Sequence, residues 1–162
     1  MQSAAKHFAR FVGLHSIAKL KMVEVHAWIT LRYSDYHSED AEQANFIYNF
    51  KQFLHKEHAW VLDDEVARLT SRNGLDCFTL NVQHNHPGVP FYPIEIFTWA
   101  AENSTGSYGL LHFHDDEDES QPNEFQVYAL KRSKLLKSKD LFLSPYVAEV
   151  EQDYDENNPP RD

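Results

Sequence analysis

The sequence predicts an α+β domain with a mostly antiparallel sheet of about five strands and two helices packed on one face. Several segments alternate apolar and polar residues, as strands do, and two longer segments repeat apolar residues at helical spacing. Turn-forming residues separate neighbouring strands. The predicted order is β-α-β-β-α-β-β, in which runs of strands with two inserted helices are typical of this class.

The first half of the chain supplies one strand, one helix and a hairpin. Apolar and polar side chains alternate over residues 23–33, which predicts a strand. A polar turn over 34–40 leads into a helix over about 41–58, with an apolar stripe at helical spacing. Strands over 64–71 and 75–83 follow. Asn73 and Gly74 join them, and this pair tolerates positive φ at low cost.

The second half supplies the other helix and the last strand pair. A loop over 84–88 precedes a helix over about 92–103, which the residues up to Gly106 terminate. Strands are predicted over 107–114 and 123–132. A basic stretch over 131–139 comes next, and a final extended segment runs to about Val150.

We expect a single domain over residues 22–151. The first 21 residues contain four basic side chains and no acid, and they are predicted to be a loosely packed extension. One interpretation is that translation starts at Met22 and that the preceding residues are an upstream extension. The alternative is that these residues form a short amphipathic membrane anchor. Residues 152–162 are acidic and end in polar residues and prolines, so a disordered tail is expected.

Composition narrows the classes of partner. The 162 residues carry a formal charge of −10, which argues against direct binding of nucleic acid or anionic lipid and permits a basic protein partner. Cys77 is the only cysteine, so an internal disulfide is excluded and a reducing, cytoplasmic compartment fits best. The sequence contains no run of 18 or more apolar residues, so it predicts no membrane-spanning helix.

A metal site is one alternative interpretation of the histidines that precede the acidic run. His112 and His114 stand two apart on a predicted strand, so their side chains share a face, and Asp116 would complete a three-ligand set. No established metal-binding motif supports this set, and the acids do not fit a calcium-binding loop. The alternative is two surface histidines beside acids. No cofactor is predicted.

Five consecutive acids lie between the last two predicted strands. They form either a solvated hairpin tip or a surface kept for a cationic partner, because adjacent carboxylates repel one another. Trp28 lies on the polar side of its strand and is a candidate interface anchor, with a place in the core as the alternative.

Taken in order, several segments resemble the immunity protein 7 family of bacterial polymorphic toxin systems. They are residues 23–33 after Met22, residues 106–111 with the acids at 115–118, residues 123–127 with 130–132, and residues 142–146. Three positions depart from the family pattern. Ser133 replaces an expected Gly, Leu141 a usual Pro and Tyr128 a common Trp.

The resemblance implies a small cytoplasmic inhibitor, without enzyme activity, that neutralises one cognate toxin domain. A nuclease-type toxin would be basic, and an acidic antidote would associate with it quickly. The hypothesis assigns toxin contact to Trp28, His112, His114, Asp115, Asp116, Glu117, Asp118 and Glu119. Two other functions stay open: a metal-dependent enzyme and an acidic mimic of nucleic acid. The sequence predicts no particular oligomeric state.

Overall fold

The computed structural model describes residues 22–37, 39–63, 65–85, 93–152 and 155–159. The extension predicted over residues 1–21 lies outside the described residues, as does part of the predicted acidic tail. No helix in these described ranges is long and apolar enough to cross a membrane.

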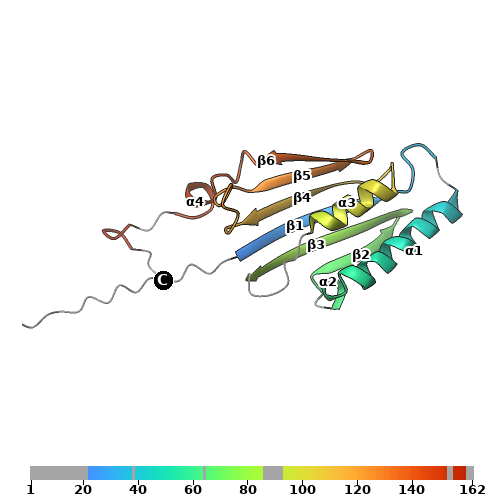
Figure 1. Cartoon of the computed structure of the whole chain (residues 1–162), viewed down its shortest axis with the longest axis horizontal. Coiled ribbons are helices and arrows are strands. Elements are labelled where there is room, and N and C mark those ends of the chain that lie inside the picture. Colours follow the sequence, from blue (N-terminus) through green and yellow to red (C-terminus); the bar gives the residue numbers. More distant parts are fainter. Residues whose placement is uncertain (1–21, 38, 64, 86–92, 153–154, 160–162) are drawn as a thin grey trace, which may run out of the picture.

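One antiparallel sheet of six strands forms the centre of the fold, in the order β2-β3-β1-β4-β5-β6 (Figure 1). The α+β prediction is confirmed, with one strand more than expected. The strands are β1 (Met22–Leu31), β2 (Ala67–Arg72), β3 (Leu75–Asn85), β4 (Tyr108–Asp115), β5 (Gln126–Lys131) and β6 (Lys134–Lys139).

The additional strand, β6, lies within the basic stretch. Arg132 and Ser133 adopt positive φ of 45° and 57°, which turns the chain tightly from β5 into β6. Gly is the residue that the resemblance leads us to expect at position 133, and a left-handed conformation there costs a non-glycine residue about 1–2 kcal/mol. Here the Ser133 hydroxyl donates a hydrogen bond to the Ser104 carbonyl oxygen at 2.8 Å, which offsets part of that cost.

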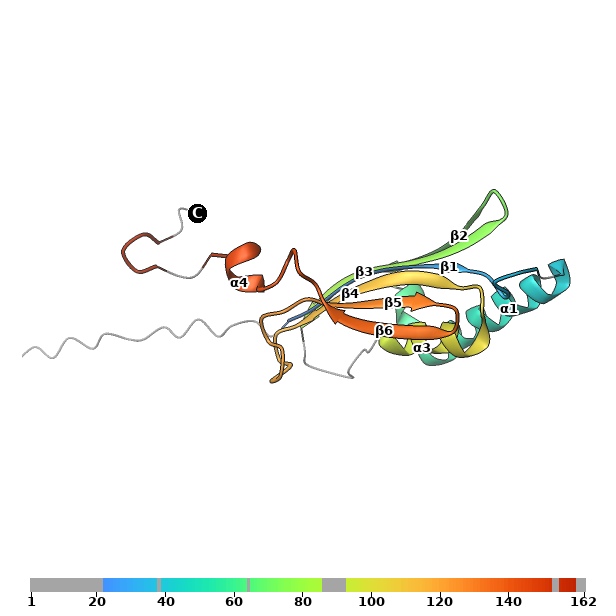
Figure 2. The same ribbon diagram turned by 90° about the horizontal axis from the view of Figure 1, so that it is seen from above.

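Two long helices cover one face of the sheet, and the other face carries no long helix in the described part of the chain (Figure 2). The helices are α1 (Asp40–Glu57), α2 (Trp60–Asp63), α3 (Ile94–Asn103) and α4 (Tyr146–Glu149). The two predicted helices correspond to α1 and α3. The short α2 was not expected, and the strand predicted from residue 64 begins only at Ala67.

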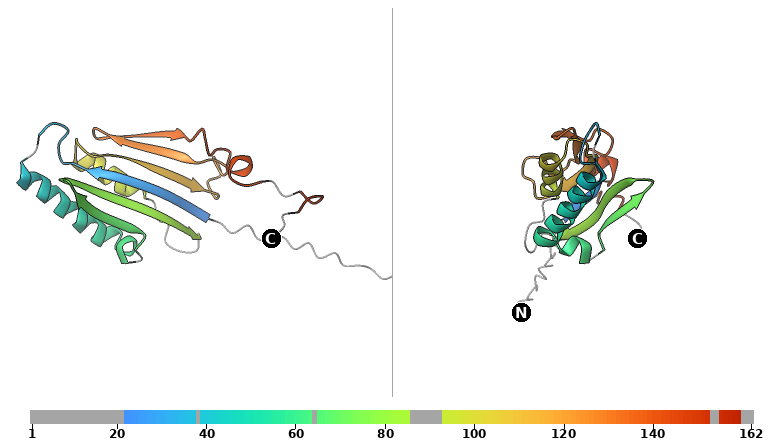
Figure 3. Two further views of the ribbon diagram at one scale, coloured as in Figure 1. Left: turned by 180° about the vertical axis from the view of Figure 1, so that it is seen from behind. Right: turned by 90° about the vertical axis from the view of Figure 1, so that its right-hand side faces the viewer.

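The predicted extended segment up to Val150 is interrupted after Val147, which keeps an extended ψ of 115°, because Ala148 at φ of 115° turns the chain within α4. The amides of Val150 and Glu151 both donate to the Tyr146 carbonyl, at 2.9 and 3.0 Å, and so close a turn. The Val147 amide donates to Asn123 Oδ1 at 2.6 Å. Figure 3 shows α4 at the end of the sheet opposite the start of α1.

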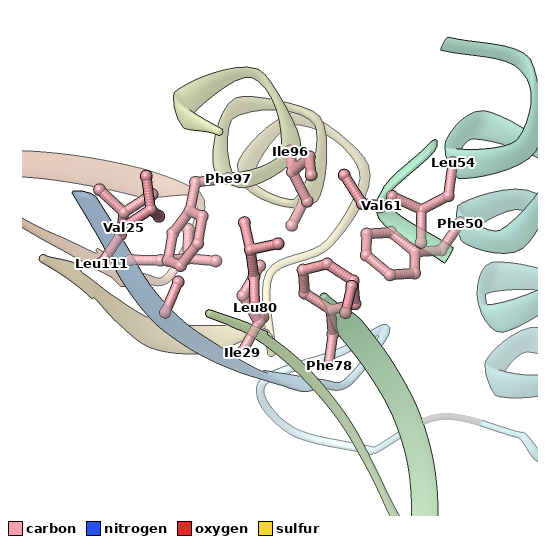
Figure 4. Close-up of a cluster of buried hydrophobic side chains, with 14 of the residues drawn as sticks. Val25, Ile29, Phe50, Leu54, Val61, Phe78, Leu80, Ile96, Phe97 and Leu111 are labelled. Atoms are coloured by element: carbon pink, nitrogen blue, oxygen red, sulfur yellow. The ribbon is translucent and has the colours of Figure 1, made fainter. Parts of the chain in front are cut away.

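The core lies between the sheet and the two long helices (Figure 4). Val25 and Ile29 project from β1, and Leu111 projects from β4, toward Phe97 of α3; all four are fully buried. Burying a side chain of this size contributes about 1.5–3 kcal/mol to folding. Alternate residues of each strand therefore face the helices, and the residues between them face away.

Gly109 sets the close approach of the two central strands. It pairs with Ile29, and a Cβ atom at this position would lie 2.1 Å from the Trp28 carbonyl oxygen. The turn between β2 and β3 has Asn73 and Gly74 at φ of 53° and 75°, as the sequence predicted. Gly109 and the turn at Asn73 and Gly74 fix the strand register, which determines which side chains face outward.

Candidate protein-binding surface

An exposed aromatic pair lies on the open face, the side of the sheet away from α1 and α3. Trp28 of β1 and Tyr108 of β4 are 39% and 41% exposed. Their ring centroids are 5.9 Å apart and their planes meet at 87°, an edge-to-face contact. Trp28 thus lies outside the core, as an interface anchor would.

A polar network borders the aromatic pair. His26 Nε2 lies 2.6 Å from Glu24 Oε1, and His26 Nδ1 lies 3.1 Å from Asn81 Oδ1. Partial burial lowers the pKa of His26, but the hydrogen bonds to Glu24 and Asn81 outweigh it, so the pKa is raised overall. His112 pairs with His26 across the strands, and its Nδ1 lies 3.7 Å from Asp140 Oδ2.

His114 occupies the same face as His112, as the strand spacing predicted, but it is only 2% exposed. The ring of Tyr146 stacks on it at 4.4 Å and 11°, and Phe125 packs beside it at 5.1 Å. The expectation of a surface histidine is therefore wrong for His114. Its aromatic surface holds the segment after β6 against this end of the open face.

The three proposed metal ligands are not brought together. Asp116 Oδ1 accepts a hydrogen bond from the Met22 amide at 2.9 Å, His114 lies beneath Tyr146, and His112 faces Asp140. Within the described part of the chain, no group of three or more His, Cys, Asp or Glu side chains could hold a metal ion. The geometry of these three side chains therefore does not support the metal-dependent alternative.

The five consecutive acids lie at the end of β4 and in the connection from β4 to β5. Three of them, Asp115, Asp116 and Asp118, order this connection through hydrogen bonds. Asp115 Oδ1 accepts from the Glu117 amide at 2.8 Å. Asp118 Oδ1 accepts from the Ser120 amide at 2.9 Å and hydroxyl at 2.6 Å. These hydrogen bonds lower the pKa of Asp118, the hydroxyl bond most. Glu119 is exposed. The aspartates thus keep the carboxylates at a fixed place.

A cleft of about 360 Å³ opens on the opposite, helical side of the molecule. Its lining is aromatic and polar: Tyr33, Glu42, Asn45, Phe46, Asn49, Trp99 and Asn103. Glu42 is the only acid among these lining residues, and no histidine or cysteine is among them.

Two exposed groups on or near the open face were not predicted from the sequence. Tyr108 shares its strand face with His112, so the alternation that placed the histidines was sufficient to find it. The second group, Leu141, Phe142 and Leu143, lies in the connection after β6. Its exposure depends on how this connection leaves the sheet, which no local pattern specifies.

Comparison with known proteins identifies one family. The immunity protein 7 family matches residues 22–152, which span all six strands and all four helices of the described structure. No curated protein and no solved structure matches the chain. Since the match covers most of the chain and begins at the first residue of β1, the chain belongs to the immunity protein 7 family.

Proposed function

We propose that this protein is an antidote that binds a cognate secreted toxin domain and neutralises it in the cytoplasm of the producing cell. The observation that carries the proposal is the family match over residues 22–152. Inhibition is stoichiometric and non-enzymatic, so the antidote acts by covering a surface of the toxin rather than by altering it chemically.

The open face supports a binding role. Trp28 and Tyr108 expose large rigid rings that lose little conformational entropy when a partner covers them, and such residues dominate protein interfaces. His26 and His112, which pair across the strands, border the pair on one side with groups that donate and accept hydrogen bonds. A desolvated aromatic centre with a polar rim is the usual anatomy of a specific interface.

Charge supports a basic toxin. The protein has a net charge of −10, and five consecutive acids lie at the end of β4 and in the following connection. A nuclease-type domain must hold a polyanion, so it carries a basic surface. Complementary charge of this kind raises association rates by up to about 10³-fold at low salt.

The proposal places the cognate toxin domain in the adjacent reading frame, and binding to that domain tests the function. We expect the full chain to form a stable one-to-one complex with a catalytically inactive form of that domain. We also expect it to restore growth of cells that express the active form. An unrelated basic protein such as lysozyme should not bind, whereas binding to it at moderate salt would indicate a general mimic of nucleic acid. No binding and no protection would contradict the proposal.

Trp28 is the residue to substitute first. Trp28→Ala should weaken the complex at least about tenfold, because the indole would be buried at the centre of the interface. Tyr48→Ala is the matched control, since Tyr48 is 59% exposed on α1, away from the open face. Equal losses in the two variants would show that the open face is not the contact surface.

A further inference from the structure

Three consecutive apolar side chains stand in solvent at one end of the sheet. Leu141, Phe142 and Leu143 are 79%, 86% and 42% exposed, and we call them the apolar tip. In the described part of the chain, Phe142 is the one phenylalanine among the exposed large hydrophobic residues. A phenylalanine left in water lacks the stabilisation that burial of its ring would provide.

The tip is held in place by polar groups beneath it. Asp140 is buried, and its Oδ1 accepts hydrogen bonds from the Phe142 amide at 2.7 Å and the Leu143 amide at 2.8 Å. Below the tip, Ser144 Oγ accepts from the Phe125 amide at 2.9 Å. The Asp140 amide donates to the Phe125 carbonyl oxygen at 2.9 Å. A tip ordered in this way loses little conformational entropy when it binds.

Acidic groups gather at the same end of the sheet. Asp115 and Lys139 both lie at the end of the sheet where β1 begins, so the acidic connection and the tip leave the sheet together (Figure 1). Among the residues that the structure describes, the acids at this end include Glu24, Asp115, Asp116, Glu117, Asp118, Glu119, Glu124, Asp140, Glu149 and Glu151, against Lys137 and Lys139. Lys139 is paired with Glu124.

This charge distribution selects among the surfaces that could cover the tip. Two copies meeting tip to tip would bring two acidic ends together, and like charges so placed oppose association. An anionic membrane surface would repel the same end. A protein with an apolar pocket bordered by Lys and Arg satisfies both the exposed side chains and the surrounding carboxylates.

We infer that the apolar tip is an anchor for the cognate toxin domain, with Phe142 inserting into an apolar pocket that basic residues border. The inference rests on the proposed function and adds a contact at the end of the sheet to the one on the open face. The surrounding carboxylates steer the tip to the pocket, and Phe142 slows dissociation once it is inserted.

The test uses the full chain and a catalytically inactive form of the cognate toxin domain. Phe142→Ala should raise Kd at least about tenfold, mainly through faster dissociation, whereas Phe142→Leu should retain most of the affinity. Tyr36→Ala is the matched control, because Tyr36 is 91% exposed at the other end of the molecule, and its Kd should stay within about twofold of wild type. All three variants should unfold at the wild-type temperature.

The outcomes separate the anchor from the function. If wild type binds and Phe142→Ala binds equally tightly, the anchor is refuted and the antidote stands. If wild type itself does not bind, both fall. Concentration-dependent dimers that Phe142→Ala abolishes in sedimentation equilibrium would assign the tip to a second copy. Co-sedimentation of wild type with phosphatidylglycerol vesicles, lost in Phe142→Ala, would assign it to lipid. Either result overturns the inference.

Discussion

His26 combines an exposed position with a charged partner, so its titration reports on the open face. Glu24→Gln removes the charge but keeps the shape of the hydrogen-bonding partner. We expect the pKa of His26, measured by NMR from the imidazole protons, to fall from its raised value toward the ordinary value of about 6.5.

The sign of the stability effect follows from the raised pKa. The ion pair stabilises the fold fully below the unfolded pKa of about 6.5, and this contribution is lost as pH rises through the folded pKa. The difference in free energy of unfolding between wild type and Glu24→Gln should shrink as pH rises from the unfolded pKa of His26 through its folded pKa. A His26 titration identical in the two proteins would show that the 2.6 Å contact does not persist in solution.

Asp140 orders the base of the apolar tip, and its charge strengthens the hydrogen bonds that it accepts. The bond from the Leu143 amide is the main cause that lowers the pKa of Asp140, and the Phe142 amide and His112 act in the same direction. Asp140→Asn should lower the free energy of unfolding at neutral pH by about 1–2 kcal/mol in urea titrations.

The effect should depend on pH in a defined direction. Because the folded pKa of Asp140 is depressed, its contribution is complete above the unfolded pKa of about 3.9 and is lost as pH falls through the folded pKa. Wild type and Asp140→Asn should therefore converge in strong acid. A constant difference at all pH values would assign the loss to packing.

Residue-scale prediction succeeded where one local rule decides the outcome. Strand alternation placed Trp28 on the polar side of β1, where it is exposed. The same rule placed His112 and His114 on one face, but it could not anticipate that Tyr146, which is distant in the sequence, would cover His114. Burial by a distant segment has no local signal.

At the scale of elements, Gly109 is the position where β1 and β4 tolerate no side chain. Gly109→Ala would place a methyl group 2.1 Å from the Trp28 carbonyl oxygen, so the two central strands must separate. We expect a loss of about 3 kcal/mol in the free energy of unfolding, by urea denaturation.

A glycine without such crowding provides the comparison. Gly74 has φ of +75°, and a methyl group added there would have no neighbouring atom within 4 Å, so Gly74→Ala meets conformational strain alone. Its expected cost is about 1–2 kcal/mol. A larger loss for Gly74→Ala than for Gly109→Ala would contradict the close-approach argument.

The elements that prediction recovered are those with strong periodicity. β1, α1 and α3 carry their apolar residues at the spacing of their structures, and each bounds the core. β6 lacks this pattern, since four of its six residues are Lys or Ser, and it forms because the turn at Arg132 and Ser133 returns it to β5. α4 depends on hydrogen bonds to Asn123, which tertiary structure supplies.

At the scale of the whole molecule, the proposal of a basic toxin implies that charge steers its approach. Glu117→Gln with Glu119→Gln removes two charges while keeping the three aspartates that order the connection. Stopped-flow measurements should show association with the cognate toxin domain slowed by up to about tenfold at low salt, with weaker salt dependence and unchanged dissociation.

The position of the removed charges, as well as their number, should affect the association rate. Asp63→Asn with Glu102→Gln removes two charges from α2 and α3, and its association rate should stay nearer that of wild type. Equal slowing in both double variants would mean that net charge alone steers the encounter.

Charge and family could be predicted from the sequence, but the proposed binding surface as a whole could not. The open face joins residues of β1 and β4 that are far apart in the chain, such as Trp28 and Tyr108. The exposure of the apolar tip could be recognised only from the fold, because it depends on which elements pack against the tip. Composition constrains charge, whereas exposure is a property of the assembled molecule.

The lysines of β6 have a consequence for solubility. β6 is the last strand in the sheet order, so its outer edge presents backbone groups that could pair with another chain. Lys134, Lys137 and Lys139 are exposed along it, and two such edges brought side by side would repel each other. Strand addition and fibre growth at β6 are thereby disfavoured, even though the adjacent open face displays apolar rings. The strand that sequence periodicity failed to predict is thus also the one whose lysines oppose edge-to-edge pairing.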